Sequence, residues 1–277
     1  DTVKMLKGSY AFIVLFKDVC DRLYGVRKEA PLIIGLSERG NFLASDVLSF
    51  LQHTNKVVFL ENLEVAEVRK DGYTIWNLSG EEVQHNISTL SWEAITLAKK
   101  EFTHYTIKEI HEQRETIPLA FNQSLEEVDR FCLTLQGVER IYIIGAGTSY
   151  HAGLVAKHLF INLAKLPVEV ILASEFEEYS TLIDESTVML AISQSGETAD
   201  VLAAINVAKK MGASVLSIVN TPSSTLARES DQTLYLNCGP EVGVAATKTF
   251  TAQLAVIYTI AHRLTNLPLN LGQITKA

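Results

Sequence analysis

The segment 193–198 (SQSGET) gathers side chains that bind oxygen, at a point where an apolar run ends. Ser193, Gln194, Ser195 and Thr198 each offer a hydrogen-bond donor, and no side chain of the segment is cationic. Free N–H groups and the dipole at the start of a helix favour an anion there. The alternative is an ordinary helix cap by Ser195 or Thr198, with Glu197 complementing the dipole. A cap needs one hydroxyl, so the surplus favours a phosphate site.

The segment 145–150 (GAGTSY) is a second candidate, again between an apolar run and a helical pattern. Its glycines let the backbone approach a ligand closely, and Thr148 and Ser149 add hydroxyls at the expected start of a helix. A dinucleotide-binding turn requires a third glycine where Tyr150 stands, which disfavours that function. The residues by themselves fit a phosphate site and a plain tight turn equally well.

The segment 241–249 (EVGVAATKT) is a third candidate and leads into a long apolar stretch. Its small residues suit close approach to a sugar. Lys248 fits a ligand-binding position and a solvated position equally well. Histidines such as His151 and His158 fit surface or helix-packing positions better than metal ligation, because no two of them form a convincing ligand pair.

Strands and helices alternate from residue 140 onward, and this order positions the three segments. The pattern predicts strands at 141–144, 168–172, 188–192, 214–219 and 233–236, and helices at 149–164, 198–211 and 247–264. Such alternation is typical of an α/β fold with a doubly wound, mainly parallel sheet and helices on both faces. Ligands of these sheets bind outside the carboxyl ends of the strands, where the three segments are expected.

Short strand-like runs fill the first 90 residues and predict antiparallel β-structure with turns. They lie at 9–16, 22–26, 31–36, 56–60, 63–69 and 73–76, with one amphipathic helix at 46–52. Charged residues between 92 and 113 indicate a linker and a surface helix. Ser124 has the spacing of a helix cap, ahead of an apolar stripe formed by Leu125, Val128, Phe131, Cys132 and Leu135.

Composition limits the classes of function. The 277 residues carry a net charge of −8 at pH 7, and such an acidic surface repels nucleic-acid phosphates. No basic cluster favours an anionic membrane, and the most apolar stretch is too short to span a bilayer. Three scattered cysteines are typical of a reducing cytoplasm. The chain starts at Asp1 without a signal-peptide pattern or initiator Met, so we expect its natural amino terminus upstream.

Residues 147–150, 193–200 and 243–248 together resemble the motifs of the sugar isomerase (SIS) domain. Over nearly the whole chain the resemblance is to the glutamine–fructose-6-phosphate aminotransferase family. Residues 6–11, 31–35 and 44–46 resemble later strands of its glutaminase domain, and 104–113 resembles the start of its isomerase half. The resemblance implies that 1–92 is the carboxyl-terminal part of a class II glutaminase domain with a partial Ntn-hydrolase fold. Residues 93–277 would be linker helices and the first SIS subdomain.

The family resemblance also implies an activity and a set of partners. Nitrogen from the amide of glutamine would be transferred to fructose 6-phosphate, with isomerisation to glucosamine 6-phosphate and without a metal or redox cofactor. The partners would be these sugar phosphates, glutamine and a second copy of the protein, with neither nucleic acid nor membrane. By motif, the phosphate would be held by Ser193, Gln194, Ser195 and Thr198, the sugar phosphate contacted by Thr148 and Ser149, and the sugar lined by the backbone of Val244 and Ala245.

No catalytic residue of the family is expected within this chain. The family's glutaminase nucleophile is an amino-terminal Cys whose own amine acts as base, whereas residue 1 here is Asp. The second SIS subdomain would follow Ala277, and the apolar helix at 247–264 is expected to be buried against it in a homodimeric protein. We therefore expect no glutaminase activity from the chain alone. Two alternatives are a stand-alone SIS isomerase or deglycase and a non-catalytic sugar-phosphate sensor.

Overall fold

The computed structural model describes residues 2–90, 99 and 101–265. The chain divides into two compact units, Asp1–Ala98 and Lys99–Ala277, called unit 1 and unit 2 below. The domain boundary predicted between residues 92 and 93 lies outside the described residues. Each unit has a hydrophobic core of its own, and each is described by itself.

Unit 1 consists of two antiparallel sheets, which confirms the strand-rich antiparallel prediction. The first sheet has the order β1 (Tyr10–Phe16), β2 (Val19–Lys28), β6 (Val65–Arg69), β7 (Tyr73–Trp76) and β8 (Glu82–Val83). The second has the order β4 (Phe42–Ala44), β3 (Ile33–Gly35), β5 (Lys56–Phe59) and β9 (Ser88–Thr89). A short helix, α1 (Thr2–Met5), precedes them.

The prediction of an amphipathic helix at 46–52 is wrong. Only a single 3₁₀ turn forms, η1 (Val47–Ser49), which begins where Asp46 accepts a hydrogen bond from the N–H of Leu48 at 2.8 Å. The apolar residues of this segment, Val47, Phe50 and Leu51, are buried without an α-helix. A further hydrogen-bonded turn follows, in which the N–H groups of His53 and Thr54 donate to the carbonyl of Phe50, and β5 then begins without an α-helix having formed.

Unit 2 is built on a five-stranded sheet in which every neighbouring pair is parallel. Its order is β11 (Val168–Leu172), β10 (Arg140–Gly145), β12 (Thr187–Ser193), β13 (Ser214–Val219) and β14 (Gln232–Tyr235). The chain therefore starts in the interior at β10, places β11 on one side, and continues with β12 on the other. This topology confirms the predicted doubly wound parallel sheet.

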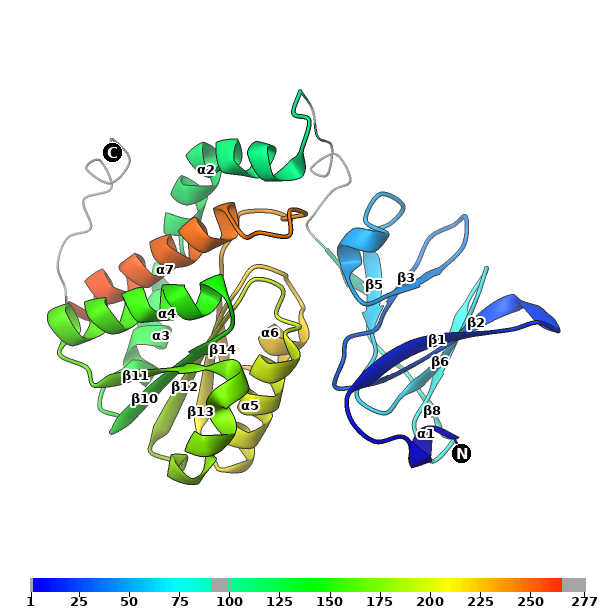
Figure 1. Ribbon diagram of the computed structural model, residues 1–277, viewed down its shortest axis with the longest axis horizontal. Helices are drawn as coiled ribbons and strands as arrows, with labels where there is room; N and C mark the ends of the chain where they lie inside the picture. The colour runs from blue at the N-terminus through cyan, green and yellow to red at the C-terminus, as the bar shows by residue number, and fades with distance from the viewer. Residues whose placement is uncertain (1, 91–98, 100, 266–277) are drawn as a thin grey trace. The chain divides into compact units, whose positions relative to one another are not determined.

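Helices cover both faces of this sheet (Figure 1). One face carries α2 (Tyr105–Phe121), α3 (Leu125–Leu135), α4 (Thr148–Leu159) with its π-turn η3 (Phe160–Ala164), and α7 (Lys248–Thr265). The other carries η4 (Ala173–Leu182), α5 (Ala199–Lys210) and α6 (Thr225–Glu229). Successive strand residues point to opposite faces. Thus Ile141 and Ile143 of β10 join the first cluster, whereas Tyr142 and Ile144 join the second.

Two helices of unit 2 pack differently from the sequence expectation. The predicted surface helix is α2, which instead packs on α7 and buries Lys108 and Glu109. The apolar side of α7 is buried inside unit 2. The expectation that this side packs against a second subdomain is therefore wrong. Ser124 does cap α3 through a bond from the N–H of Glu127 at 3.4 Å, but Leu125 is exposed and leaves the predicted stripe.

No helix in the part of the chain that the structure describes is long and apolar enough to cross a membrane.

Candidate functional site

A cavity of about 350 Å³ opens at the carboxyl ends of β10 and β12 in unit 2. From these two neighbouring strands the chain leaves in opposite directions, toward β11 after β10 and toward β13 after β12. Loops at such a switch point diverge and leave a crevice between them, which is the usual ligand site of open α/β sheets. All eight candidate residues line this cavity: Thr148, Ser149, Ser193, Gln194, Ser195, Thr198, Val244 and Ala245.

Two helix amino termini border the cavity. Helix α4 begins at Thr148, directly after Gly147, whose φ of 55° is a conformation that glycine adopts without strain. Helix α5 begins after Thr198, which occupies the N-cap position. Unpaired N–H groups and the positive ends of both helix dipoles are therefore directed toward the same space, which favours an anion.

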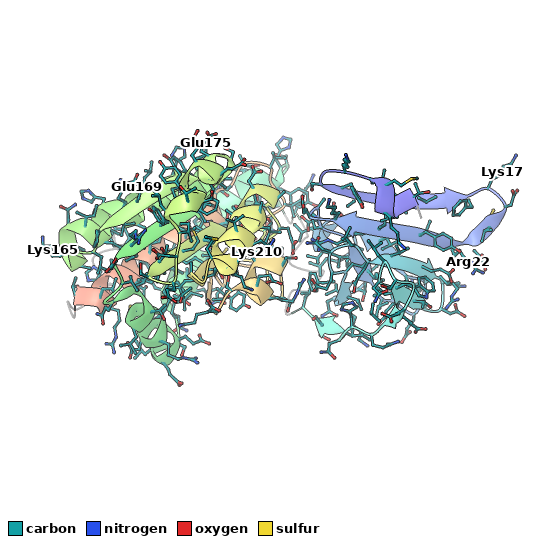
Figure 2. The ribbon with its side chains drawn as sticks, turned by 90° about the horizontal axis from the view of Figure 1, so that it is seen from below. Lys17, Arg22, Lys165, Glu169, Glu175 and Lys210 are labelled. Carbon is teal, nitrogen blue, oxygen red and sulfur yellow. The ribbon has the colours of Figure 1, made fainter. Side chains whose placement is uncertain are left out.

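Among the described residues, none of those that line the cavity has an ionisable side chain. Charged residues such as Lys165, Glu169, Glu175 and Lys210 are exposed on the outside of unit 2 instead (Figure 2). An anion in the cavity would consequently be held by hydroxyl, amide and backbone N–H groups. This is the chemistry expected for a phosphate bound without a lysine or arginine.

The hydroxyls of the 193–198 loop do not cap α5. The Oγ of Ser195 accepts a bond from the N–H of Glu197 at 3.1 Å, and the Oγ of Ser193 accepts one from Gly196 at 3.0 Å. Thr198 makes no side-chain cap bond, and its Oγ1 lies 3.3 Å from the Oγ of Ser193. A hydroxyl that accepts a bond still has its own proton to donate. The arrangement therefore matches a ligand cradle better than a helix cap.

Glu197 has a different role from the one considered for it in the sequence. Its Oε1 accepts a bond from the N–H of Thr225 at 2.7 Å, at the start of α6. The carboxylate thus complements the amino terminus of α6 rather than that of α5. This bond fixes one end of the 193–198 loop against a neighbouring loop.

Ser149 is oriented by a residue that the sequence did not single out. Gln253 of α7 is 1% exposed and its Nε2 donates to the Oγ of Ser149 at 2.9 Å. With a lone pair of Ser149 occupied in this way, the proton of the hydroxyl remains for a ligand oxygen. A signal was present in the sequence, because Gln253 is a polar residue within the apolar stripe of a helix.

We expect Gln253→Leu to weaken binding of an anionic ligand in the cavity by about threefold to tenfold, because Ser149 loses the bond that orients its hydroxyl. Isothermal titration calorimetry of Gln253→Leu, Ser149→Ala and the double variant measures the effect. The double variant should be no weaker than Ser149→Ala, since both changes act through one hydroxyl. Independent, additive losses would contradict this role of Gln253.

The third wall of the cavity comes from the loop between β14 and α7. Val244 is fully exposed, so the loop meets the cavity through its backbone and through Ala245 and Ala246. Lys248 is neither a solvated side chain nor a residue of the cavity wall: it is 3% exposed and its Nζ lies 2.7 Å from Glu112 of α2. No local pattern around Lys248 or Glu112 predicts this long-range ion pair.

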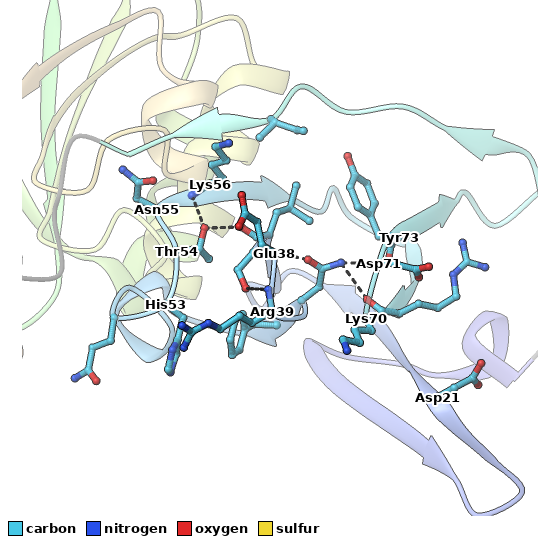
Figure 3. A pocket seen from close by; sticks show the side chains of 18 residues that line it. Asp21, Glu38, Arg39, His53, Thr54, Asn55, Lys56, Lys70, Asp71 and Tyr73 are labelled. Carbon is cyan, nitrogen blue, oxygen red and sulfur yellow. Dashed lines mark hydrogen bonds between the residues drawn. The ribbon is translucent and has the colours of Figure 1, made fainter.

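Unit 1 contains a wider hollow, of about 1400 Å³ (Figure 3). Its wall combines the labelled cations Arg39, Lys56 and Lys70 with the acids Glu38 and Asp71, so it has no single sign of charge. Hydrogen bonds within the wall hold the loops together, including that from Thr54 to the carbonyl of Leu36. The helical segments described in unit 1, α1 and η1, have only four and three residues, so neither offers the amino terminus of a long helix to an anion. Size alone therefore does not make it the stronger candidate.

Comparison with known proteins identifies the family to which the chain belongs. A model of the SIS domain matches residues 134–263, which carry all eight candidate residues. The chain thus contains a sugar isomerase domain. It is 42% identical over 262 residues to the glutamine–fructose-6-phosphate aminotransferase (isomerizing) of Aquifex aeolicus, covering 95% of this chain and 44% of that protein. The same enzyme of Thermococcus kodakarensis is 44% identical over 261 residues, covering 94% and 43%.

A solved structure supports the same assignment. The C-terminal domain of glucosamine-fructose-6-phosphate aminotransferase from Francisella tularensis matches with a TM-score of 0.55 and 37% identity, over 65% of this chain and 53% of that one. The chain belongs to the glutamine–fructose-6-phosphate aminotransferase family. It spans less than half the length of the curated relatives that it matches.

Proposed function

We propose that the protein containing this chain makes glucosamine 6-phosphate from fructose 6-phosphate and glutamine, and that the cavity of unit 2 binds the sugar phosphate. The observation that carries the proposal is the convergence of eight uncharged residues and two helix amino termini on one cavity at the switch point of the sheet. The names of the relatives supply the identity of the sugar and of the nitrogen donor.

Within this proposal, each group has a part in binding. Ser193, Gln194, Ser195 and Thr198 hold the phosphate from the side of α5, and Thr148 and Ser149 contact it from the side of α4. The backbone of Val244 and Ala245 lies against the sugar. Unit 1 belongs to the glutaminase part of the protein and takes part in the supply of nitrogen from glutamine.

We expect the protein to bind fructose 6-phosphate about a hundredfold more tightly than fructose, because at least two bonds to the phosphate, of roughly 1.5–3 kcal/mol each, are lost with the free sugar. Isothermal titration calorimetry with the two ligands measures the ratio. Equal affinities would contradict a phosphate site.

Product analysis of the full protein with and without glutamine separates the amidotransferase from a stand-alone isomerase, which converts its substrate without glutamine.

The proposal includes a homodimeric protein in the cytoplasm. The dimer is supported by exposed apolar side chains outside α7: Leu154 of α4 and Ile161 of η3 are both exposed. Exposed apolar side chains of this kind are typical of interfaces. The three cysteines are free thiols, as is usual in a reducing compartment. Sedimentation velocity of the full protein at micromolar concentration tests the dimer.

A further inference from the structure

A buried carboxylate of α2 holds the loop that forms the third wall of the cavity. Glu109 is 1% exposed, and its Oε1 accepts bonds from the backbone N–H of Val242 at 2.6 Å and of Gly243 at 3.1 Å. These bonds join residues 133 and 134 positions apart in the chain. A helix on the amino-terminal side of the SIS match thus contacts the last loop of the site directly.

The carboxylate of Glu109 lies directly beside Gly243, where any other residue would have its Cβ. A Cβ built on Gly243 would overlap the Oε2 of Glu109 and would lie 3.0 Å from the Oγ1 of Thr106, also on α2. A larger residue at this position would therefore have to displace the carboxylate of Glu109. The sequence analysis proposed that small residues here allow close approach to a sugar. In the structure, the space beside Gly243 is occupied by the carboxylate of Glu109.

The other end of the loop is tied by a second buried carboxylate. Glu241 accepts bonds from the N–H and the Oγ1 of Thr247, at 2.8 and 3.1 Å, and from the hydroxyl of Thr249. Between the two tied ends lie residues 244–246, all three of which line the cavity. We call residues 244–246 the arch. On one side of it Val242 and Gly243 are hydrogen-bonded to the carboxylate of Glu109, and on the other side Thr247 and Thr249 are hydrogen-bonded to the carboxylate of Glu241.

We infer that Glu109 is a positioning residue for the sugar-phosphate site, and that α2 is a working part of that site although it lies outside the SIS match. Burial of a carboxylate is costly unless hydrogen bonds compensate it. Here the compensation comes from the backbone N–H groups of Val242 and Gly243. The carboxylate fixes the arch in the unliganded protein, so less conformational entropy is lost when the sugar binds. The inference rests on the proposed function of the cavity.

The test compares Glu109→Ala and Glu109→Gln with two matched controls, Glu115→Ala and Glu115→Gln, at an exposed position of the same helix. Hydrogen exchange of the amides of Val242 and Gly243, measured without ligand, should accelerate at least tenfold in Glu109→Ala. The dissociation constant for fructose 6-phosphate should rise by about tenfold. Glu109→Gln should restore both to within about threefold of the parent, because its amide oxygen accepts the same two bonds. The Glu115 variants should match the parent.

Gly243→Ala provides a second variant that keeps the carboxylate. Its methyl group displaces Glu109, so it should reproduce the faster exchange and the weaker binding of Glu109→Ala, even where the latter is too unstable to study. Unchanged exchange at Val242 and Gly243 in Glu109→Ala and Gly243→Ala would overturn the inference, as would faster exchange with unchanged affinity. A parent protein that does not bind fructose 6-phosphate would instead overturn the proposed function, while the exchange result would still report on the tie between α2 and the arch.

Discussion

Gly196→Ala is expected to lower the free energy of unfolding of unit 2 by about 2–5 kcal/mol. Gly196 has a φ of +68°, where an L side chain is strained. A Cβ built on Gly196 would also lie only 2.6 Å from the Cβ of Ser224 and 2.8 Å from the Cγ2 of Val219. Both distances are too short for contacts between carbon atoms. The loop has to move to accept the methyl group. Because Gly196 lies between Ser195 and Thr198, the dissociation constant for fructose 6-phosphate should rise by at least about tenfold.

Two further variants separate the collision from the backbone strain. Gly212→Ala has the same kind of strain, with φ of +87°, but its nearest neighbour is 3.5 Å away, so it should cost only about 1–2 kcal/mol and leave affinity unchanged. Ser224→Gly should partly rescue Gly196→Ala by removing the side chain that is hit. Urea unfolding followed by circular dichroism, with calorimetric titration, gives both quantities. A Gly196→Ala protein no less stable than Gly212→Ala would show that the collision is unimportant.

Ser195→Ala and Thr198→Val are each expected to raise the dissociation constant for fructose 6-phosphate about tenfold or more. Bonds from hydroxyls to a charged group are worth roughly 1.5–3 kcal/mol, and ~1.4 kcal/mol is a factor of ten. No cationic side chain lines the described cavity to compensate for a lost hydroxyl. Glutamine hydrolysis measured in the full protein without sugar should hardly change, because we assign that chemistry to the other part of the protein.

Stability measurements distinguish a ligand bond from a helix cap in these variants. Thr198 occupies the N-cap position of α5 without a side-chain cap bond, so Thr198→Val should change the free energy of unfolding by less than about 0.5 kcal/mol. Loss of a true cap costs about 1 kcal/mol. Thr259→Val, whose hydroxyl bonds the carbonyl of Ala255 within α7 away from the cavity, is the matched control for affinity. A Thr198→Val protein that is destabilised yet binds normally would identify the hydroxyl as a cap.

The periodicity of the sequence was sufficient to predict the sheet of unit 2. Strand β12 is buried at all seven positions, so its apolar run is continuous and its end at Ser193 is visible from the residues alone. Helices α5 and α7 begin within about one residue of the predicted starts. Since parallel strands place their carboxyl ends at one edge, the same information placed the loops at 145–150 and 193–198 at one edge of the sheet. The pairing of β10 with β12, which makes these loops neighbours, came from the structure.

Local patterns were less reliable where one turn or a packed partner decides the outcome. The spacing of Val47, Phe50 and Leu51 is that of a helix, yet all three are buried without an α-helix. Leu125 begins the apolar stripe of α3 but is exposed, because it lies at the first position of the helix. Helix α2 has few apolar residues and was expected on the surface, although α7 covers one side of it.

Neighbours within about seven residues were enough to predict the five strands of unit 2, its helices α4, α5 and α7, and the oxygen-binding loops. The pairing of distant side chains followed from the three-dimensional packing: Glu109 with Val242 and Gly243, Lys248 with Glu112, and Gln253 with Ser149. These contacts span 104 to 136 positions and are set by the packing of α2 and α7 on the sheet. A periodic pattern tells which side of a helix is buried, but not which polar group will lie opposite it. Of these residues only Gln253, a polar residue within an apolar stripe, had a recognisable signal, and its partner Ser149 could not be read from it.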